Sequence, residues 1–377
     1  MNPIDRPRGA SAVPTQGSAL ANEAGPGEGA AGAPEDAKPA ARLGSSGVNR
    51  AAVGAPLHRP APTRAPPVHP ADLEQAAYIV ARQALGRPLT AESKNLLWTA
   101  NETRKEVLEL LPHGRGNIQS DFQNSDGESK ARTAALRLLR GGLPTEGLAA
   151  PEQRAMRAAF AARAGAGNCA EFAEVSAHVH AGHLGDGDRI VRQRVDNLDH
   201  GWARVQCATP EGGEPRSGPA AVLDVWADGP IVEPADSRYG HGTPSQTNDS
   251  QPITSGDARA IVQAFEASRG PALDGHVTEL VKLASEFKRN RTDANPAYFL
   301  DPIPVVSQGF ADQAHNAILS GSPTSLRASA VAALLDAPAP LTREQAEANV
   351  DTVVALASNL DRPEPEARHV FRPIAED

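Results

Sequence analysis

The chain has very little cysteine, with two in 377 residues, Cys169 and Cys207. Two cysteines can form at most one bridge, so a fold built on a disulfide framework is not expected. A reducing compartment suits a chain that keeps its thiols free for chemistry.

Long apolar runs and an excess of positive charge are also missing. No apolar stretch approaches the roughly 18 residues of a membrane-spanning helix, so no membrane span is expected. The net charge is −9, and because residues 1–70 hold seven basic and five acidic side chains, the remainder carries −11. So acidic a chain lacks the positive surface that attracts phosphate backbones, which argues against nucleic acid as its partner.

Residues 1–70 contain no aromatic side chain, but 12 Pro, 9 Gly and 16 Ala. They have too little apolar bulk to offset the entropy cost of ordering, so we expect a disordered leader. The leader lacks the hydrophobic core of a Sec signal, and Asn2 stands where N-myristoylation needs glycine. We therefore expect any export to use a route that accepts an unfolded leader. Residues 362–377 are expected to form a tail.

Between these ends, apolar spacing predicts helices, then strands, then helices again. Short β-branched and aromatic runs at 190–195, 202–207 and 221–226 indicate an antiparallel sheet. The stretches 113–130 and 236–256 show no periodicity and are expected to be loops, the second long enough for a lid or binding loop. The predicted fold class is α+β. Its predicted parts are an N-terminal helical region at 71–150, a core at 151–250, and a C-terminal helical part of the same domain at 251–361.

Cys169 stands where one of these helices is expected to begin. Asn168 is a preferred N-cap residue, and Glu171 completes a variant of the capping box. The positive end of the helix dipole favours a thiolate there. The glycines just before it would let the backbone approach a substrate and offer an amide to an oxyanion. The alternative is that Cys169 is only a small apolar residue packed near a helix start.

His200 and Asp224 complete a set of reactive groups. Because side chains alternate along a strand, His200 shares a face with Trp202, and Asp224 shares a face with Trp226. Two neighbouring antiparallel strands can therefore present His200 and Asp224 side by side. A thiol, an imidazole and a carboxylate are the nucleophile, the base and the orienting group of thiol-based acyl transfer.

Other candidates are weaker. Asp199 adjoins His200, but its side chain should point to the opposite face or into the turn, which leaves it as the alternative orienting acid. Cys207 should point away from His200, so we expect it in the core. Three histidines are spread around the helix that begins at Cys169, which predicts no metal site: His178, His180 and His183.

The motifs resemble those of a known superfamily. Gly-x-Cys-x-x-x-Ala at 167–173, His-x-Trp-x-x-Val at 200–205 and the later Asp224 are similar to the core motifs of transglutaminase-like (papain-like) cysteine enzymes. The resemblance covers about residues 160–230. It implies a nucleophile helix packed on an antiparallel sheet, with Cys169, His200 and Asp224 as the catalytic triad. One departure is Arg204, where many members carry an acidic residue, and this change implies a different substrate preference.

Within that superfamily, the acidic chain, its Ser/Pro/Ala-rich leader and its flanking helices resemble the HopX/AvrPphE family of type III effectors of plant-pathogenic bacteria. This resemblance implies export by the type III secretion machinery into the host-cell cytoplasm or nucleus. It also implies a host plant protein as the substrate or target. Members carry a separate N-terminal region for a host target or cofactor, and residues 71–150 are the candidate for it.

We therefore expect an enzyme that acts as a protease, a deamidase or a transglutaminase on a host target. The predicted chemistry uses no metal and no organic cofactor, and the sequence identifies no cofactor-binding residue. The alternative is a non-catalytic module that binds a host protein on a transglutaminase-like scaffold. A helical structural or chaperone-like protein agrees least with the tryptophan-containing strands.

Overall fold

A computed structural model describes residues 67–195, 198–208, 218–240, 246–248, 251–290, 299–301 and 303–361. All of them belong to one unit of the chain, which begins at Arg64. The predicted tail and nearly all of the predicted leader lie outside these residues. Val68 is buried and Pro70 opens the first helix, so ordered structure begins a few residues earlier than predicted.

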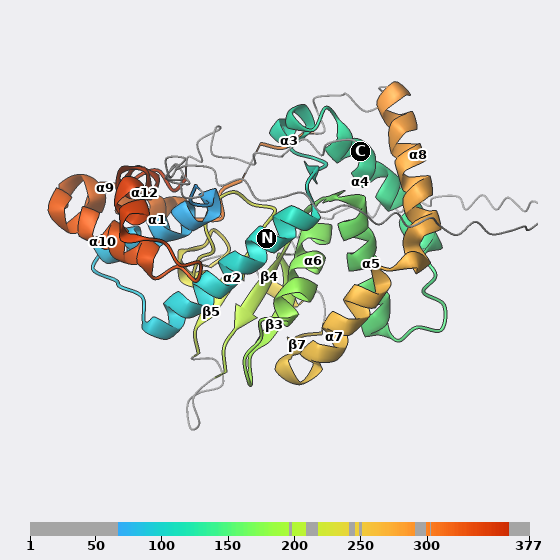
Figure 1. Cartoon of the computed structure of the whole chain (residues 1–377), viewed down its shortest axis with the longest axis horizontal. Helices are drawn as coiled ribbons and strands as arrows, with labels where there is room; N and C mark the ends of the chain where they lie inside the picture. The colour runs from blue at the N-terminus through green and yellow to red at the C-terminus, as the bar shows by residue number, and fades with distance from the viewer. Residues whose placement is uncertain are drawn as a thin grey trace, which may run out of the picture. The chain divides into compact units, whose positions relative to one another are not determined.

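The described fold is mixed α+β and rich in helix, as predicted (Figure 1). The helices are α1 (Pro70–Ala84), α2 (Ala91–Leu110), α3 (Gln119–Asn124), α4 (Glu128–Leu139), α5 (Ala150–Ala164), α6 (Cys169–Ala181), α7 (Ser255–Ser268), α8 (Asp274–Asn290), α9 (Gln308–Ser320), α10 (Pro323–Leu335), α11 (Arg343–Ala348) and α12 (Val350–Ala357). The strands are β1 (Gly114–Arg115), β2 (Ala166–Gly167), β3 (Arg189–Val195), β4 (Leu198–Gln206), β5 (Ala220–Leu223), β6 (Gln246–Asn248) and β7 (Ile253–Thr254). Three short 3-10 helices are η1 (Arg140–Gly142), η2 (Pro234–Asp236) and η3 (Pro271–Leu273).

The main sheet is antiparallel, in the order β5-β4-β3-β6, and β7 also pairs with β3. This confirms the predicted antiparallel strands. β5 ends at Leu223, three residues earlier than predicted. The reason is local, since the Asp224 carboxylate accepts a hydrogen bond from the Ala227 amide (3.1 Å) and turns the chain.

Helices cover the sheet and extend from both of its sides (Figure 1). α6 packs on β3 and β4, and α2 packs on β5 and α6. α1 packs against α9, α10 and α12, whereas α4 and α5 pack against α7 and α8. The helices of residues 71–150 therefore contact different parts of the fold.

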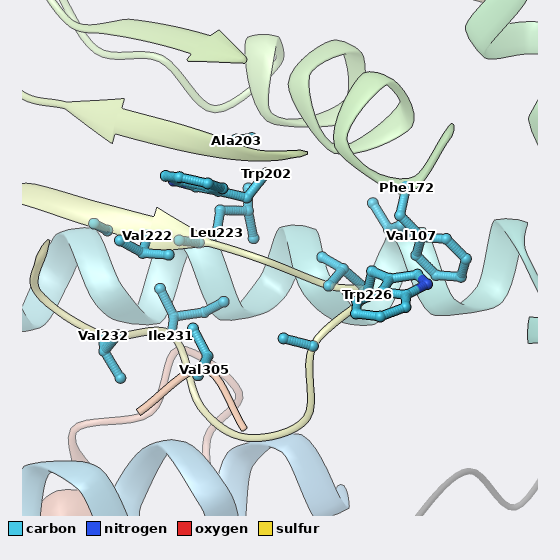
Figure 2. Close-up of a cluster of buried hydrophobic side chains, with 14 of the residues drawn as sticks. Val107, Phe172, Trp202, Ala203, Val222, Leu223, Trp226, Ile231, Val232 and Val305 are labelled. Carbon is cyan, nitrogen blue, oxygen red and sulfur yellow. The ribbon is translucent and has the colours of Figure 1, made fainter. Parts of the chain in front are cut away.

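One cluster of the hydrophobic core joins buried side chains from distant segments of the chain (Figure 2). Val107 comes from α2, Phe172 from α6, Trp202 from β4, and Leu223 and Trp226 from β5 and the turn after it. All five are buried. Burying a large apolar side chain stabilises a fold by roughly 1.5–3 kcal/mol, so this cluster fixes α2 and α6 against the sheet.

The prediction of a loop at 113–130 is wrong, because β1, α3 and the start of α4 lie there. The buried Arg115 organises this stretch. Its guanidinium contacts Asp121 (2.8 Å), Asp228 (3.0 Å) and the Trp226 carbonyl (2.8 Å). Burial alone would lower the pKa of Arg115, but the two carboxylates raise it, so the side chain stays charged. Contacts so distant in sequence leave no periodic pattern.

The second predicted loop is also corrected. The predicted loop at 236–256 contains β6, β7 and the start of α7, while residues 241–245 and 249–250 lie outside the described part. Within the predicted C-terminal helical part, the stretch from Arg343 forms two helices, α11 and α12, separated at Asn349. None of the helices in the part that the structure describes has the length and apolar character needed to cross a membrane.

Replacing Arg115 by Ala should destabilise the fold by about 3–5 kcal/mol, because it leaves two buried carboxylates without their cation. The matched control is Arg343→Ala, which removes an exposed ion pair with Glu347 and should cost less than about 1 kcal/mol. Urea unfolding followed by circular dichroism measures both changes. Similar losses in the two variants would contradict the role given to Arg115.

Candidate active site

Cys169 is the first residue of α6, as predicted. Gly165 caps the end of α5 with a positive φ of 70°, and the chain then passes through β2 and Asn168 into α6. The Glu171 carboxylate accepts a hydrogen bond from the Asn168 amide (2.9 Å), so the glutamate half of the predicted capping box is present. Cys169 is half-buried.

The structure brings the three predicted groups together. The Nε2 atom of His200 in β4 lies 2.6 Å from Oδ2 of Asp224, which follows β5 directly. The imidazole is also hydrogen-bonded to Cys169. Because Nε2 is taken by the carboxylate, Nδ1 is the nitrogen left for the sulfur. The ring thus lies between a carboxylate and a thiol, the order in which a triad operates.

Asp224 is buried, with 1% of its side chain exposed. Besides His200, it accepts hydrogen bonds from the Tyr239 hydroxyl (2.7 Å) and the Ala227 amide (3.1 Å). Burial raises the pKa of Asp224, but the charge and hydrogen bond of His200, together with the other two donors, lower it overall. The group therefore remains a carboxylate that can orient an imidazole.

The charge state of His200 follows from its two neighbours. Burial lowers its pKa, but the charge and hydrogen bond of Asp224, followed by those of Cys169, raise it to about 10. His200 is therefore an imidazolium at neutral pH. A cation hydrogen-bonded to sulfur favours the thiolate, which is the nucleophilic form of cysteine.

Aromatic rings hold the imidazole in place. The ring centroids of Trp226, Tyr239 and Trp202 lie 5.0, 5.4 and 6.0 Å from that of His200. Trp202 and Tyr239 also stack on each other at 4.2 Å. Such packing restricts the rotation of the imidazole and keeps water away from its hydrogen bond with Asp224.

Sequence reasoning missed Tyr239, which lies in a stretch predicted as a polar loop. Its position depends on α1, because Asp236 just before it accepts hydrogen bonds from Tyr78 (2.7 Å) and Arg82 (2.7 Å) of that helix. Long-range contacts of this kind leave no signal in a single sequence. Within residues 71–150, α1 thus supports the site.

Asn117 was also missed. The Trp226 indole donates a hydrogen bond to Oδ1 of Asn117 (3.1 Å), which fixes the side-chain amide and leaves its Nδ2 donors for another acceptor. β1 and β2 run parallel, and the Gly116 amide bonds to the Gly167 carbonyl (3.0 Å). Arg115 of β1 lies opposite Gly167 of β2, and α6 begins two residues after Gly167. Asn117, two residues after Arg115, therefore lies near the start of α6.

The other sequence candidates lie elsewhere. The side chain of Asp199 is outside the described residues. Cys207 is half-buried against the core, and burial, followed by the nearby Asp188, raises its pKa to about 11. His178 and His180 of α6, and His183 just after the helix, make separate contacts with the Glu174 carbonyl, the Thr103 hydroxyl and the Glu106 carboxylate, respectively. Among the described residues, no group of His, Cys, Asp and Glu side chains is arranged to hold a metal ion.

Comparisons with known proteins add no relative. No protein-family model matches the sequence, no curated protein is similar to it, and no solved structure is similar to the fold. The chemistry of the site is therefore argued from the residues of this chain alone.

The two thiols should react differently with iodoacetamide. Cys169 should be alkylated at pH 6, because its sulfur is hydrogen-bonded to the imidazolium of His200. Cys207, with a pKa of about 11, holds only about one thiolate in 10⁵ molecules at pH 6, and its rate should rise about tenfold per pH unit. Mass spectrometry of labelled peptides measures both rates.

His200→Gln is the control for this prediction. Glutamine keeps hydrogen-bonding capacity but cannot carry the proton. The variant should therefore lower the alkylation rate of Cys169 at pH 6 and leave the alkylation rate of Cys207 unchanged. Equal inertness of both thiols at pH 6 in the unaltered chain would contradict an activated Cys169.

Proposed function

We propose that this chain is a cysteine-dependent acyl-transfer enzyme with Cys169, His200 and Asp224 as its catalytic triad. The observation that carries the proposal is the continuous line of hydrogen bonds from Asp224 through His200 to Cys169. The substrate is an amide, either a peptide bond or the side chain of glutamine. The resemblance of the motifs to transglutaminase-like enzymes supports the same chemistry.

The reaction starts from the thiolate of Cys169 beside the imidazolium of His200. The sulfur attacks the carbonyl carbon, a carbon–sulfur bond forms, and the carbonyl π electrons move onto the oxygen. As the oxyanion collapses, His200 gives its proton to the departing nitrogen and the carbon–nitrogen bond breaks. This leaves a thioester and a neutral imidazole, whose orientation Asp224 maintains.

Neutral His200 then acts as the base for the second half of the reaction. It takes a proton from water or from an amine, which attacks the thioester and releases the thiolate. Water yields proteolysis from a peptide bond and deamidation from glutamine, and an amine yields transamidation. Product analysis by mass spectrometry separates the three outcomes.

The oxyanion of the proposed reaction needs hydrogen-bond donors, and the chain offers two sources of them. The first amides of α6 have no partner within the helix and carry its positive dipole end. The Nδ2 group of Asn117 is the second, because the bond from Trp226 to Oδ1 fixes which end of the amide is free. We assign Asn117 the role of an oxyanion donor.

We further propose that the chain is a type III effector that acts on a plant protein in the host-cell cytoplasm or nucleus. The sequence resemblance to the HopX/AvrPphE family supports this. A translocation reporter fused to residues 1–70 should reach plant cells from a bacterium with a type III secretion system. Equal delivery from a mutant that lacks the secretion system would contradict the proposal.

Cys169→Ala should abolish acyl transfer, with a loss of roughly a thousandfold or more, because no other group replaces the sulfur. The assays are ammonia release, incorporation of a labelled amine and peptide cleavage in host-protein extracts. Circular dichroism confirms that the variant folds. If the effect on host cells survives intact in this variant, the chain acts as a binding module and the proposal is wrong.

Asn117→Asp provides a sharper second variant. Aspartate keeps the size of the side chain but replaces the donor with a negative charge, so turnover should fall by roughly a hundredfold or more. Alkylation of Cys169 should hardly change, because that reaction forms no oxyanion. Equal losses in turnover and alkylation would show that Asn117 only supports the fold.

A further inference from the structure

A second feature lies beside the nucleophile helix. A pocket of about 530 Å³ is bounded by α5, the first turns of α6, β3 and η1. Its other lining residues are Leu, Phe, Ala and Gly, so its chemistry comes from charged side chains. We call it the arginine pocket, and its charged residues are Arg140, Arg154, Arg157, Arg192, Glu171 and Glu174.

The positive charge of the pocket is only half neutralised. Arg192 forms an ion pair with Glu174, and Arg140 lies 3.7 Å from the Glu171 carboxylate. Arg154 and Arg157 make no ion pair or hydrogen bond within the described part of the chain. The pocket therefore presents two uncompensated guanidinium groups in a chain whose net charge is −9.

The two free guanidinium groups are held close to other cations. Burial lowers the pKa of both Arg154 and Arg157, and the charge of Arg192 lowers both further. A cluster of like charges costs free energy when the protein has no ligand. An anion that enters the pocket removes that repulsion and gains charge-assisted hydrogen bonds as well.

The pocket begins one residue from the sulfur. Ala170, which follows Cys169, is exposed and belongs to the pocket lining. From Ala170 to Glu174 the helix rises by about 6 Å, which about two residues of extended chain can span. A peptide whose amide lies at Cys169 would thus reach the pocket with the residues next to that amide.

We propose that the arginine pocket is a substrate subsite that binds an acidic peptide segment, with Arg154 and Arg157 as the direct carboxylate ligands. The proposal rests on the proposed function for the position of the reacting amide. Two free guanidinium groups match two carboxylates, each of which can accept a bidentate pair. A polyphosphate would bring more negative charge than these two groups neutralise.

The test measures binding without turnover, in the Cys169→Ala background. Two fluorescent decapeptides share a central Gln and differ only in its flanks, which are Glu-Glu in one and Gln-Gln in the other. Fluorescence polarisation should show the acidic peptide binding at least roughly tenfold more tightly. Added salt should reduce this preference.

The double variant Arg154→Ala with Arg157→Ala should lose the preference for the acidic peptide. The matched control is Arg259→Ala with Arg289→Ala, which changes the net charge equally at two exposed arginines on α7 and α8 and should preserve it. Thermal melting verifies the fold of each variant. Arg154→Lys with Arg157→Lys keeps the charge but loses the bidentate geometry, and should retain only part of the preference.

Several outcomes would overturn the subsite. These are equal binding of both peptides, binding of neither, or an acidic preference that survives in the double alanine variant. Saturable binding of pyrophosphate that requires Arg154 and Arg157, without acidic-peptide binding, would identify a phosphate ligand instead. Arginine-dependent peptide binding by a chain that proves to have no acyl-transfer activity would refute the proposed function and leave the acidic-peptide site standing.

Discussion

The buried carboxylate of Asp224 is the constraint on which the site depends. An ionised group without access to water is tolerated only when hydrogen bonds replace its hydration. Here the donors come from three segments, namely His200 on β4, the Ala227 amide in the following turn, and Tyr239. The strand, the turn and the distant loop must all be in place before the carboxylate is satisfied. Formation of the site is thereby coupled to formation of the sheet.

A second buried charge fixes the other end of the same turn. Arg115 binds the Trp226 carbonyl and the Asp228 carboxylate, so the turn is held between Asp224 at its start and Arg115 at its end. The Trp226 ring lies within this turn, where it contacts His200 and donates to Asn117. One short turn thus sets the imidazole, its aromatic neighbour and the proposed oxyanion donor relative to one another.

The residues predicted from sequence are those whose positions follow from local rules. Cys169 was found because a capping pattern marks a helix start, and His200 with Asp224 because strand alternation places them on one face. Asn117 and Tyr239 follow no such rule. They meet Trp226 and Asp224 across 109 and 15 residues of chain, through loops without periodicity. The same reason explains why the elements within 113–130 were missed. Burial of Arg115 creates that structure, and burial of a charge cannot be read from spacing.

The electrostatics of the whole chain and of the arginine pocket act in opposite directions. With a net charge of −9, the protein repels an acidic peptide at long range, but salt limits that repulsion to about 8 Å at physiological ionic strength. Inside the pocket, guanidinium groups and carboxylates meet in a partly desolvated setting, where their attraction is stronger than in water. Long-range repulsion acts mainly on the association rate, and close pairing acts mainly on the dissociation rate. Selectivity for acidic segments in such a protein therefore resides in how slowly the bound peptide leaves.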